Sequence, residues 1–375
     1  MKQKKKARPR GRLEHQLYPR YLTLPAFILF TVFFILPILG GVGISLTNWT
    51  VSRPSITRFV GLKNYITMFQ DDDILLAFKN TAIFTVAIVI LRNLFAILLA
   101  LALVKKLYTR TYLRTIFYIP AVLSYVVVGI MFTAMFQMNG TFNQILNAFG
   151  IPCTKEWLAS GDTALLMVIV EDVWKWTGFH MIIYIAGLQA IPTDLYEAAK
   201  IDGASAVRTF FSVTLPLLIP SLTINVTQAI IGGFRVFEQV LTLTDGGPGH
   251  QSTVVSMMVY EYFGRGFYGK STAISMMLSV IVLFVTLAVR GYFNNHNHRP
   301  RRWFAQAPLG PITSRTYRFI ESSFYCMMRP TAIEIAAWRI LLFVSPWLSV
   351  FLNHTLSPAF QTCSSLRSDI FSGHS

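Results

Sequence analysis

Residues 196–204 read Tyr196-Glu197-Ala198-Ala199-Lys200-Ile201-Asp202-Gly203-Ala204, and the same stretch runs on to Leu215-Pro216. It is a short segment of mixed polarity between two long apolar runs. Its Ala-Ala-Lys triplet favours a helix, and Gly203 permits a bend that a residue with a Cβ would resist. We therefore expect two short helices joined at Gly203. Because proline is tolerated in the first turn of a helix, Leu215-Pro216 predicts a new helix start.

The composition of the rest of the chain indicates a polytopic membrane protein. Of its 375 residues, 53% are hydrophobic and 13% are charged, whereas soluble domains carry about 25% charged residues. Several apolar runs reach the roughly 20 residues that cross a bilayer as a helix. We therefore predict an all-α helical bundle in a membrane.

The basic residues gather at the ends of the chain. Of the formal net charge of +16, residues 1–20 contribute +7 and residues 299–375 contribute +5. This distribution is typical of cytoplasmic flanks that follow the positive-inside bias. Nucleic-acid binding is disfavoured, because no aromatic and basic groove pattern accompanies the charge.

Charge in the connections predicts six spans with both ends of the core in the cytoplasm. Lys and Arg crowd residues 105–114, 191–214 and 290–302, whereas residues 138–162 contain only Lys155. The connection 48–79 fits less well, since it carries four basic residues. The six predicted spans are residues 22–46, 81–104, 115–136, 164–190, 215–243 and 271–293. The first is read as a span because no cleavage site for a signal peptide follows it.

The polar stretch carries a family signature. Glu197-Ala198-Ala199, Gly203 and Leu215-Pro216 match in spacing the EAA motif of permease subunits of ABC importers, with Val213 in place of the usual Ile. Five further segments match the sugar-importing branch: Phe59-Val60-Gly61-Leu62-Lys63-Asn64-Tyr65, Asn80-Thr81, Ala186-Gly187-Leu188-Gln189-Ala190-Ile191-Pro192, Asp202-Gly203-Ala204 and Thr244-Asp245-Gly246-Gly247-Pro248. Over residues 13–298 the chain resembles a binding-protein-dependent ABC sugar permease.

This resemblance implies a six-span ABC importer permease core with cytoplasmic coupling helices. Residues 194–212 look like the helices that dock into a cleft of the ATPase, within a coupling loop 191–214. Glu197 would face the ATPase, and the small Ala198 and Ala199 would allow close approach. The coupling residues are expected to be Glu197, Ala198, Ala199, Asp202, Gly203, Ala204, Leu215 and Pro216. Asp202 has an alternative role as the cap of the second helix.

The implied function is import of a carbohydrate, either a mono- or oligosaccharide or a polyol, across a bacterial plasma membrane. The expected partners are a second permease subunit, two cytoplasmic ATPase subunits, an extracytoplasmic solute-binding protein and membrane lipid. Residues 1–20 form a cytoplasmic segment, 21–298 the permease domain and 299–375 an atypical extension. Glycerol phosphate, polyamine or phosphate is an alternative solute. A secondary transporter, which predicts two repeat halves, and a non-transporting assembly protein are alternative classes.

No catalytic role is expected in this chain. Residues 264–271, from Gly264 to Ser271, fit the P-loop pattern, yet they precede a span on the predicted outer side, where no α/β domain surrounds them. We interpret them as a turn with an interfacial Lys270. ATP and Mg²⁺ are then expected on the partner ATPase, with no cofactor here. The spacing of Cys153, Cys326 and Cys363 favours no metal site.

Ionisable residues inside spans are candidates for function. Planar polar groups mixed with aromatic rings suit a path for a polyol, and the candidate residues are Trp174, Lys175, Asn225, Gln228, Phe234, Phe237 and Glu238. Asp172 and Lys175 are three residues apart, so they are alternatively a pair that neutralises itself. Arg92 is expected to pair internally or to face a crevice.

The extension from residue 299 departs from the family pattern. Its apolar run, residues 335–351, is interrupted by Arg339 and Pro346. A helix lying on the membrane surface and a seventh span are both open. We hypothesise that the extension is unrelated to transport, which loss of uptake on deleting residues 303–375 from a normally inserted protein would contradict.

Overall fold

The computed structural model describes residues 24–52, 55, 57–105 and 108–306. The basic segment 1–20 and the extension beyond residue 306 lie outside these residues. The described chain falls into two units, residues 24–40 and residues 41–306. Within those ranges the backbone forms helices and one isolated antiparallel bridge, between Thr47 and Phe59. The predicted all-α class is confirmed.

The first described helix, Leu24–Ser45, lies within the predicted span 22–46. It consists of α2 (Leu24–Phe30), the π-helical turn η2 (Thr31–Ile35) and α3 (Leu36–Ser45), with a mean hydropathy of 2.5. The N–H of Leu36 donates to the carbonyl of Thr31, five residues back. A proline ring clashes with the carbonyl four residues before it. The wider π turn therefore accommodates Pro37 without ending the helix.

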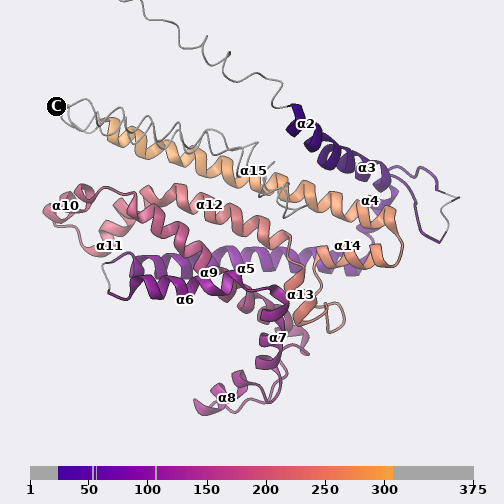
Figure 1. Cartoon of the computed structure of the whole chain (residues 1–375), viewed down its shortest axis with the longest axis horizontal. Helices are drawn as coiled ribbons and strands as arrows, with labels where there is room; N and C mark the ends of the chain where they lie inside the picture. Colours follow the sequence, from indigo (N-terminus) through magenta and orange to yellow (C-terminus); the bar gives the residue numbers. More distant parts are fainter. Residues whose placement is uncertain (1–23, 53–54, 56, 106–107, 307–375) are drawn as a thin grey trace, which may run out of the picture. The chain divides into compact units, whose positions relative to one another are not determined.

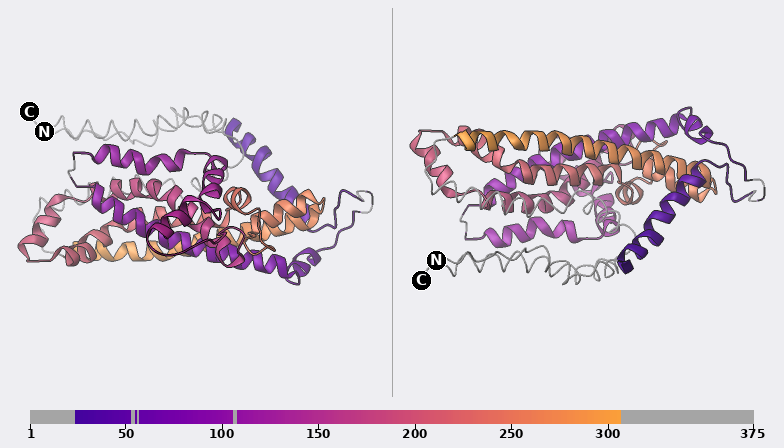
Figure 2. Two further views of the ribbon diagram at one scale, coloured as in Figure 1. Left: turned by 90° about the horizontal axis from the view of Figure 1, so that it is seen from below. Right: turned by 90° about the horizontal axis from the view of Figure 1, so that it is seen from above.

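Four long helices run side by side in the second unit: α5 (Asp72–Leu103), α9 (Gly161–Gln189), α12 (Leu215–Phe234) and α15 (Tyr268–Gln306) (Figures 1 and 2). Helix α5 packs against α9 and α12, and α12 packs against α15. The predicted spans 81–104, 164–190 and 271–293 lie on α5, α9 and α15, although α5 begins nine residues earlier and α15 ends thirteen residues later than predicted.

The predicted span 115–136 is not one straight helix. It is two helices, α6 (Arg110–Val122) and α7 (Tyr125–Phe136), bent by 98°. Leu123 and Ser124 between them have extended backbone, with ψ of 145° and 142°. Pro120 in the last turn of α6 has no N–H to donate to the helix, and α6 ends two residues later, at Val122.

The boundaries predicted for the span 215–243 are also wrong at both ends. Helix α11 (Ala206–Thr209), the π-helical turn η4 (Phe210–Thr214) and α12 form one helix of 29 residues. As at Pro37, a π turn directly precedes the Leu-Pro pair, so Pro216 lies inside a continuous helix. At the other end α12 stops at Phe234, after Gly232-Gly233, and α13 (Glu238–Leu243) is separate.

Four described helices are long and apolar enough to cross a membrane: Leu24–Ser45, Asp72–Leu103, Ala206–Phe234 and Tyr268–Phe293. The bent pair α6 and α7 makes a fifth if it is one span. Helix α9 has 29 residues, and three charged residues lie near its middle. The count of six therefore stays a prediction that depends on the bent pair being one span and on α9 being another.

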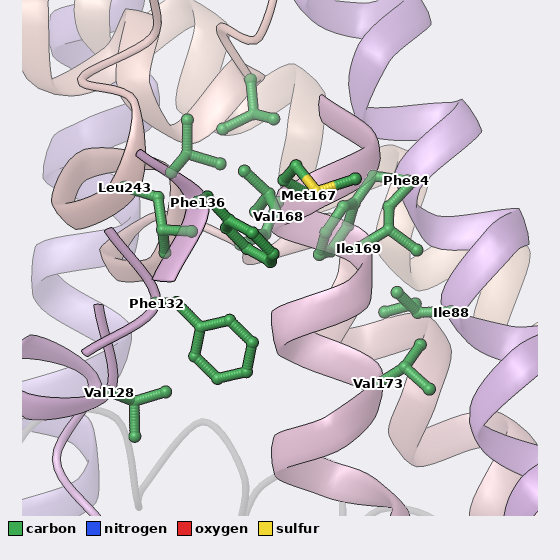
Figure 3. Close-up of a cluster of buried hydrophobic side chains, with 13 residues drawn as sticks. Phe84, Ile88, Val128, Phe132, Phe136, Met167, Val168, Ile169, Val173 and Leu243 are labelled. Carbon is green, nitrogen blue, oxygen red and sulfur yellow. The ribbon is translucent and has the colours of Figure 1, made fainter. Parts of the chain in front are cut away.

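One core cluster joins α5, α7, α9 and α13. Figure 3 shows Phe84 and Ile88 facing Met167, Ile169 and the rest of their buried cluster. Members from the other two helices are Val128, Phe132, Phe136, Val240 and Leu243. In lipid, helices associate by close packing rather than by leaving water. This cluster therefore fixes α7 and α13 to the middle and one end of α9.

The short helices lie at the two ends of the bundle. Helix α10 (Thr193–Ile201) and α11 lie at one end, whereas α4 (Lys63–Met68) and α14 (Val255–Gly264) lie at the other (Figure 1). Helix α8 (Thr141–Ala148) follows α7. The polar stretch of residues 196–204 thus lies at one end of the bundle (Figure 1).

Candidate functional site

The predicted helix, glycine and helix of the polar stretch are confirmed. Helix α10 ends at Ile201, and Gly203 follows with φ of +72°. Ala204 N–H donates to the carbonyl of Ala199 at 2.9 Å, and Gly203 N–H donates to that of Lys200 at 3.0 Å. This pair of bonds is the Schellman end of a helix, in which glycine supplies the left-handed residue. Gly203 therefore ends α10 and turns the chain toward α11.

Asp202 does not cap the second helix. Ser205 is the N-cap of α11, and its hydroxyl oxygen accepts from the N–H of Arg208 at 3.4 Å. Asp202 is instead the C-cap of α10, where its own N–H donates to the carbonyl of Ala198 at 3.0 Å. The exposed carboxylate of Asp202 is thus left for another contact.

The α10–α11 unit is attached to the bundle on one side and exposed on the other. Ala199 is buried, and Tyr196 packs against a second core cluster that includes Tyr184 and Leu218. The outward side carries large apolar residues at high exposure: Ile201 at 87%, Val207 at 67% and Phe211 at 62%. Glu197, Ala198 and Asp202 are exposed there too. A rigidly held, partly apolar tip of this kind is suited to docking into another protein.

A second polar site lies at the middle of α9. Asp172 is 0% exposed and accepts from Arg92 of α5, through Nε at 2.7 Å and through Nη2. Its other oxygen accepts from Gln239 Nε2 of α13 at 3.0 Å. Arg92 therefore pairs internally, as predicted, and three helices are joined through one carboxylate. The alternative pair of Asp172 with Lys175 is not the one that forms.

Lys175 instead binds the end of α6. Its side chain is buried, and Nζ donates to the carbonyl of Pro120 at 3.1 Å and to that of Leu123. The ammonium also lies 4.6 Å from the centroid of the Tyr125 ring, at the first residue of α7. Tyr125 OH accepts from Trp176 Nε1 at 3.0 Å. The bend between α6 and α7 is thus closed against the middle of α9.

Asn225 of α12 is also bound within the protein. Its Oδ1 lies 2.9 Å from His180 Nδ1, and its Nδ2 donates to the carbonyl of His180 at 3.1 Å. One turn further along α9, Tyr184 OH donates to Asn93 Oδ1 of α5 at 2.5 Å. Each of these side chains is buried. They form a ladder of polar contacts along one side of α9.

The remaining residues of the predicted solute path are less buried. Trp174 is 41% exposed and packs edge-on against Phe132. Phe234 ends α12, Phe237 lies in the break and Glu238 opens α13; the two rings are half-buried and Glu238 is exposed. Gln228, two turns earlier in α12, is half-buried. Phe234, Phe237 and Glu238 thus lie at the break between α12 and α13, and Gln239 in the first turn of α13 joins that region to α9.

Both helix breaks therefore meet the same turn of α9. The structure brings Lys175 to the break between α6 and α7, whereas Trp174 packs against Phe132 within α7. Arg92, Tyr125 and Gln239, which were not among the predicted path residues, meet the same turn of α9. The break at Leu123 and Ser124 had one sequence signal, Pro120. The sequence signal for the break after Phe234 was the pair Gly232-Gly233.

The P-loop pattern forms the predicted turn, between α14 and α15. Gly266 has φ of +82°, and its carbonyl accepts from Val51 N–H at 2.9 Å. Gly269 N–H donates to the carbonyl of Trp49 at 3.0 Å. A Cβ at Gly269 would lie 2.2 Å from the carbonyl oxygen of Thr47. These glycines thus allow close packing against residues 47–51. Within the described residues, no group of three or more His, Cys, Asp or Glu side chains is placed to hold a metal ion.

Known proteins resemble this chain over most of its length. It is 33% identical over 285 residues to the probable ABC transporter permease protein YurN of Bacillus subtilis, covering 75% of this chain and 97% of that one. It is 37% identical over 267 residues to the trehalose/maltose transport system permease protein MalF of Thermococcus litoralis, covering 71% and 90%.

A solved structure shares the fold. The bacterial alginate ABC transporter, in complex with a periplasmic protein bound to an alginate pentasaccharide, aligns with a TM-score of 0.66 at 23% identity, over 76% of this chain and 97% of that one. Residues 92–302 match the family described as binding-protein-dependent transport system inner membrane component. Together with the apolar spans, these matches show that the chain is a multi-pass membrane protein and belongs to the family of binding-protein-dependent transport permeases.

Proposed function

We propose that this chain is a membrane-spanning subunit of an ATP-driven importer that takes up a carbohydrate. The carrying observation is the α10–α11 unit, whose inner side is anchored in the bundle while its outer side exposes Ile201, Val207 and Phe211. We assign the tip to docking in a cleft of one of two cytoplasmic ATPase subunits, which would bind ATP and Mg²⁺.

The tip is built to transmit a rigid movement. Tyr196 and Ala199 fix α10 to the bundle, and α11 continues through η4 into α12 as one helix. A push on α11 would therefore be carried along α12, toward its break at Phe234. We assign Glu197 and Asp202 to polar contacts with the ATPase, and Ala198 to close approach. Gly203 and Ala204 shape the turn, and Leu215-Pro216 lies in the continuous helix that would carry the movement.

The solute path is assigned to the two helix breaks at the middle of α9. Transporters commonly place their sites where broken helices meet near the middle of the membrane. Trp174, Phe234 and Phe237 offer aromatic faces, while Gln228 and Glu238 offer polar groups. Lys175 and Asn225 hold hydrogen bonds inside the protein, and we assign to them the support of this path rather than direct contact with solute.

Carbohydrate is the solute class that the relatives favour. The Thermococcus litoralis relative is named for trehalose and maltose, and another, at 34% identity, for multiple sugars. The family description names dependence on a binding protein. We therefore expect a solute-binding protein outside, a second permease subunit, and residues 1–20 in the cytoplasm of a bacterial cell.

The test is ATP-dependent uptake by the purified assembly. Affinity purification from the native membrane should recover an ATPase and a second permease, which mass spectrometry identifies. In proteoliposomes with ATP on the α10 side, labelled maltose or trehalose on its binding protein should accumulate only with both ATP and that protein. Uptake by this chain alone, driven by an ion gradient, would contradict the proposal. A binding protein that takes glycerol phosphate or a polyamine instead would change the solute class only.

A further inference from the structure

One side chain of α9 contacts both sides of the break between α6 and α7. Lys175 Nζ donates to the carbonyls of Pro120 and Leu123, at the C-terminal end of α6. It also lies over the ring of Tyr125, the first residue of α7. The ammonium therefore serves as the cap of one helix and as a contact for the next.

The contact of Lys175 with the end of α6 stabilises the bend between α6 and α7. The last carbonyls of a helix lack partners within it, and a positive charge stabilises that end. In the bilayer core no water replaces a missing partner. Gly178 lets the two helices approach closely, since a Cβ there would lie 1.7 Å from the carbonyl oxygen of Phe117. This approach brings the lysine within reach of α6.

The same helix, α9, carries a second possible acceptor for Lys175, the carboxylate of Glu171. Glu171 is 0% exposed, and neither of its carboxylate oxygens has a hydrogen-bond partner in the described part of the chain. A buried carboxylate in this state is costly. Glu171 precedes Lys175 by four residues, the spacing and order that favour an ion pair along a helix. The lysine therefore has a choice of two partners.

We propose that Lys175 is a positioning residue that alternates between these two partners. While it binds Pro120 and Leu123, α7 is bent away from α6. When it turns to Glu171, the end of α6 loses its cap and α7 moves toward the line of α6. Helix α7 packs against α13, so this movement also shifts the break between α12 and α13. The assignment of the movement to opening and closing of the solute path rests on the proposed function.

The movement is measurable as a distance between spin labels. Tyr112 of α6 and Met138, two residues after α7, are exposed sites for labelled cysteines, in a background where Cys153, Cys326 and Cys363 are replaced by serine. With a rise of 1.5 Å per residue, a straight helix would separate their backbones by about 39 Å, and the observed bend of 98° by about 26 Å. Pulsed electron resonance on the full chain in lipid nanodiscs separates the two populations.

Two isosteric variants should move the populations in opposite directions. Lys175→Met removes the cap, so the shorter distance should be lost in favour of a longer or broader one. Glu171→Gln removes the competing charge, so any longer-distance population should be lost. Thr177→Val is the matched control, because the hydroxyl of Thr177 bonds only within α9, to the carbonyl of Val173 at 2.5 Å. Its distances should equal those of the parent.

Equal shifts in both variants, or no shift in either, would overturn the proposal. Opposite shifts without ATP-dependent uptake by the assembly would leave the switch standing and remove its assigned role in import. In the assembly, a transition-state analogue of ATP should redistribute the two distances in the parent and not in Glu171→Gln. This comparison also separates a positioning role from a purely structural one, since a structural defect does not depend on nucleotide.

Discussion

The chain turns sharply at Gly203 and at Leu123, and the two turns are stabilised in different ways. At Gly203 the backbone satisfies itself through the bonds to Ala199 and Lys200, and the turn is exposed. At Leu123 the end of α6 is satisfied by Lys175, a side chain 52 residues away. A turn exposed to water can be stabilised by its own backbone alone, because water hydrogen-bonds any donor or acceptor that stays unpaired. A turn inside the membrane needs a partner from another helix, and it can change when that partner moves.

The largest loss of stability is expected when the buried pair of Arg92 and Asp172 loses one of its charges. Asp172→Leu leaves Arg92 buried without its carboxylate, and removing one partner of a buried pair costs about 3–5 kcal/mol. Thermal unfolding in detergent, followed by size-exclusion chromatography, should show a markedly lower midpoint.

The double variant Arg92→Met with Asp172→Leu is the control for this loss. Because neither charge remains, it should recover most of the stability. A double variant as unstable as the single one would show that packing, not the unpaired charge, causes the defect.

A smaller effect is expected at the exposed turn. Gly203→Ala places a Cβ in the left-handed region, at a cost of about 1–2 kcal/mol, although nothing lies within 4 Å of the added atom. The α10–α11 turn should open while the bundle stays folded. Hydrogen exchange should therefore rise for residues 199–209 alone, whereas exchange that also rises across α9 would contradict the independence of the two turns.

A third variant removes the cap of α11. Ser205→Ala loses the acceptor for Arg208 N–H, and the loss of such a cap costs typically about 1 kcal/mol. Exchange should rise at residues 206–209 and less than in Gly203→Ala. Ser205→Asp keeps a capping oxygen and should restore protection, so a variant that stays unprotected would argue against the capping role.

The smallest effect on stability is expected at the exposed carboxylate of α10. Glu197→Lys touches no buried group, so its unfolding free energy should stay within about 0.5 kcal/mol of the parent. ATP-dependent uptake should nevertheless fall while membrane insertion is kept, and Glu197→Gln should fall less. Unchanged uptake in Glu197→Lys would separate this residue from the ATPase.

The sequence was sufficient for the features that depend on neighbours in the chain. The α10–Gly203–α11 turn and the long apolar helices follow from residues within a few positions of one another. The partner of Asp172 could not be predicted, since Arg92 lies 80 residues earlier. The break at Leu123 could not be placed either, because Pro120 permits a kink, a stop or a continued helix. Which of these occurs is decided by Lys175 and Gly178 of α9.

The π turn η4 sets the rotational phase of α12 relative to α11. Leu215 N–H donates to the carbonyl of Phe210, five residues back, so one residue more than an α-helix needs is held in this turn. Each residue of an α-helix advances the direction of the side chains by about 100°. Winding Phe210–Thr214 as ordinary α-helix, with no residue removed, would turn the face of α12 that carries Asn225 by about that angle relative to the α11 tip. The π turn thus determines which face of α12 packs against α9. This orientation is a separate property from the transmission of movement along the helix.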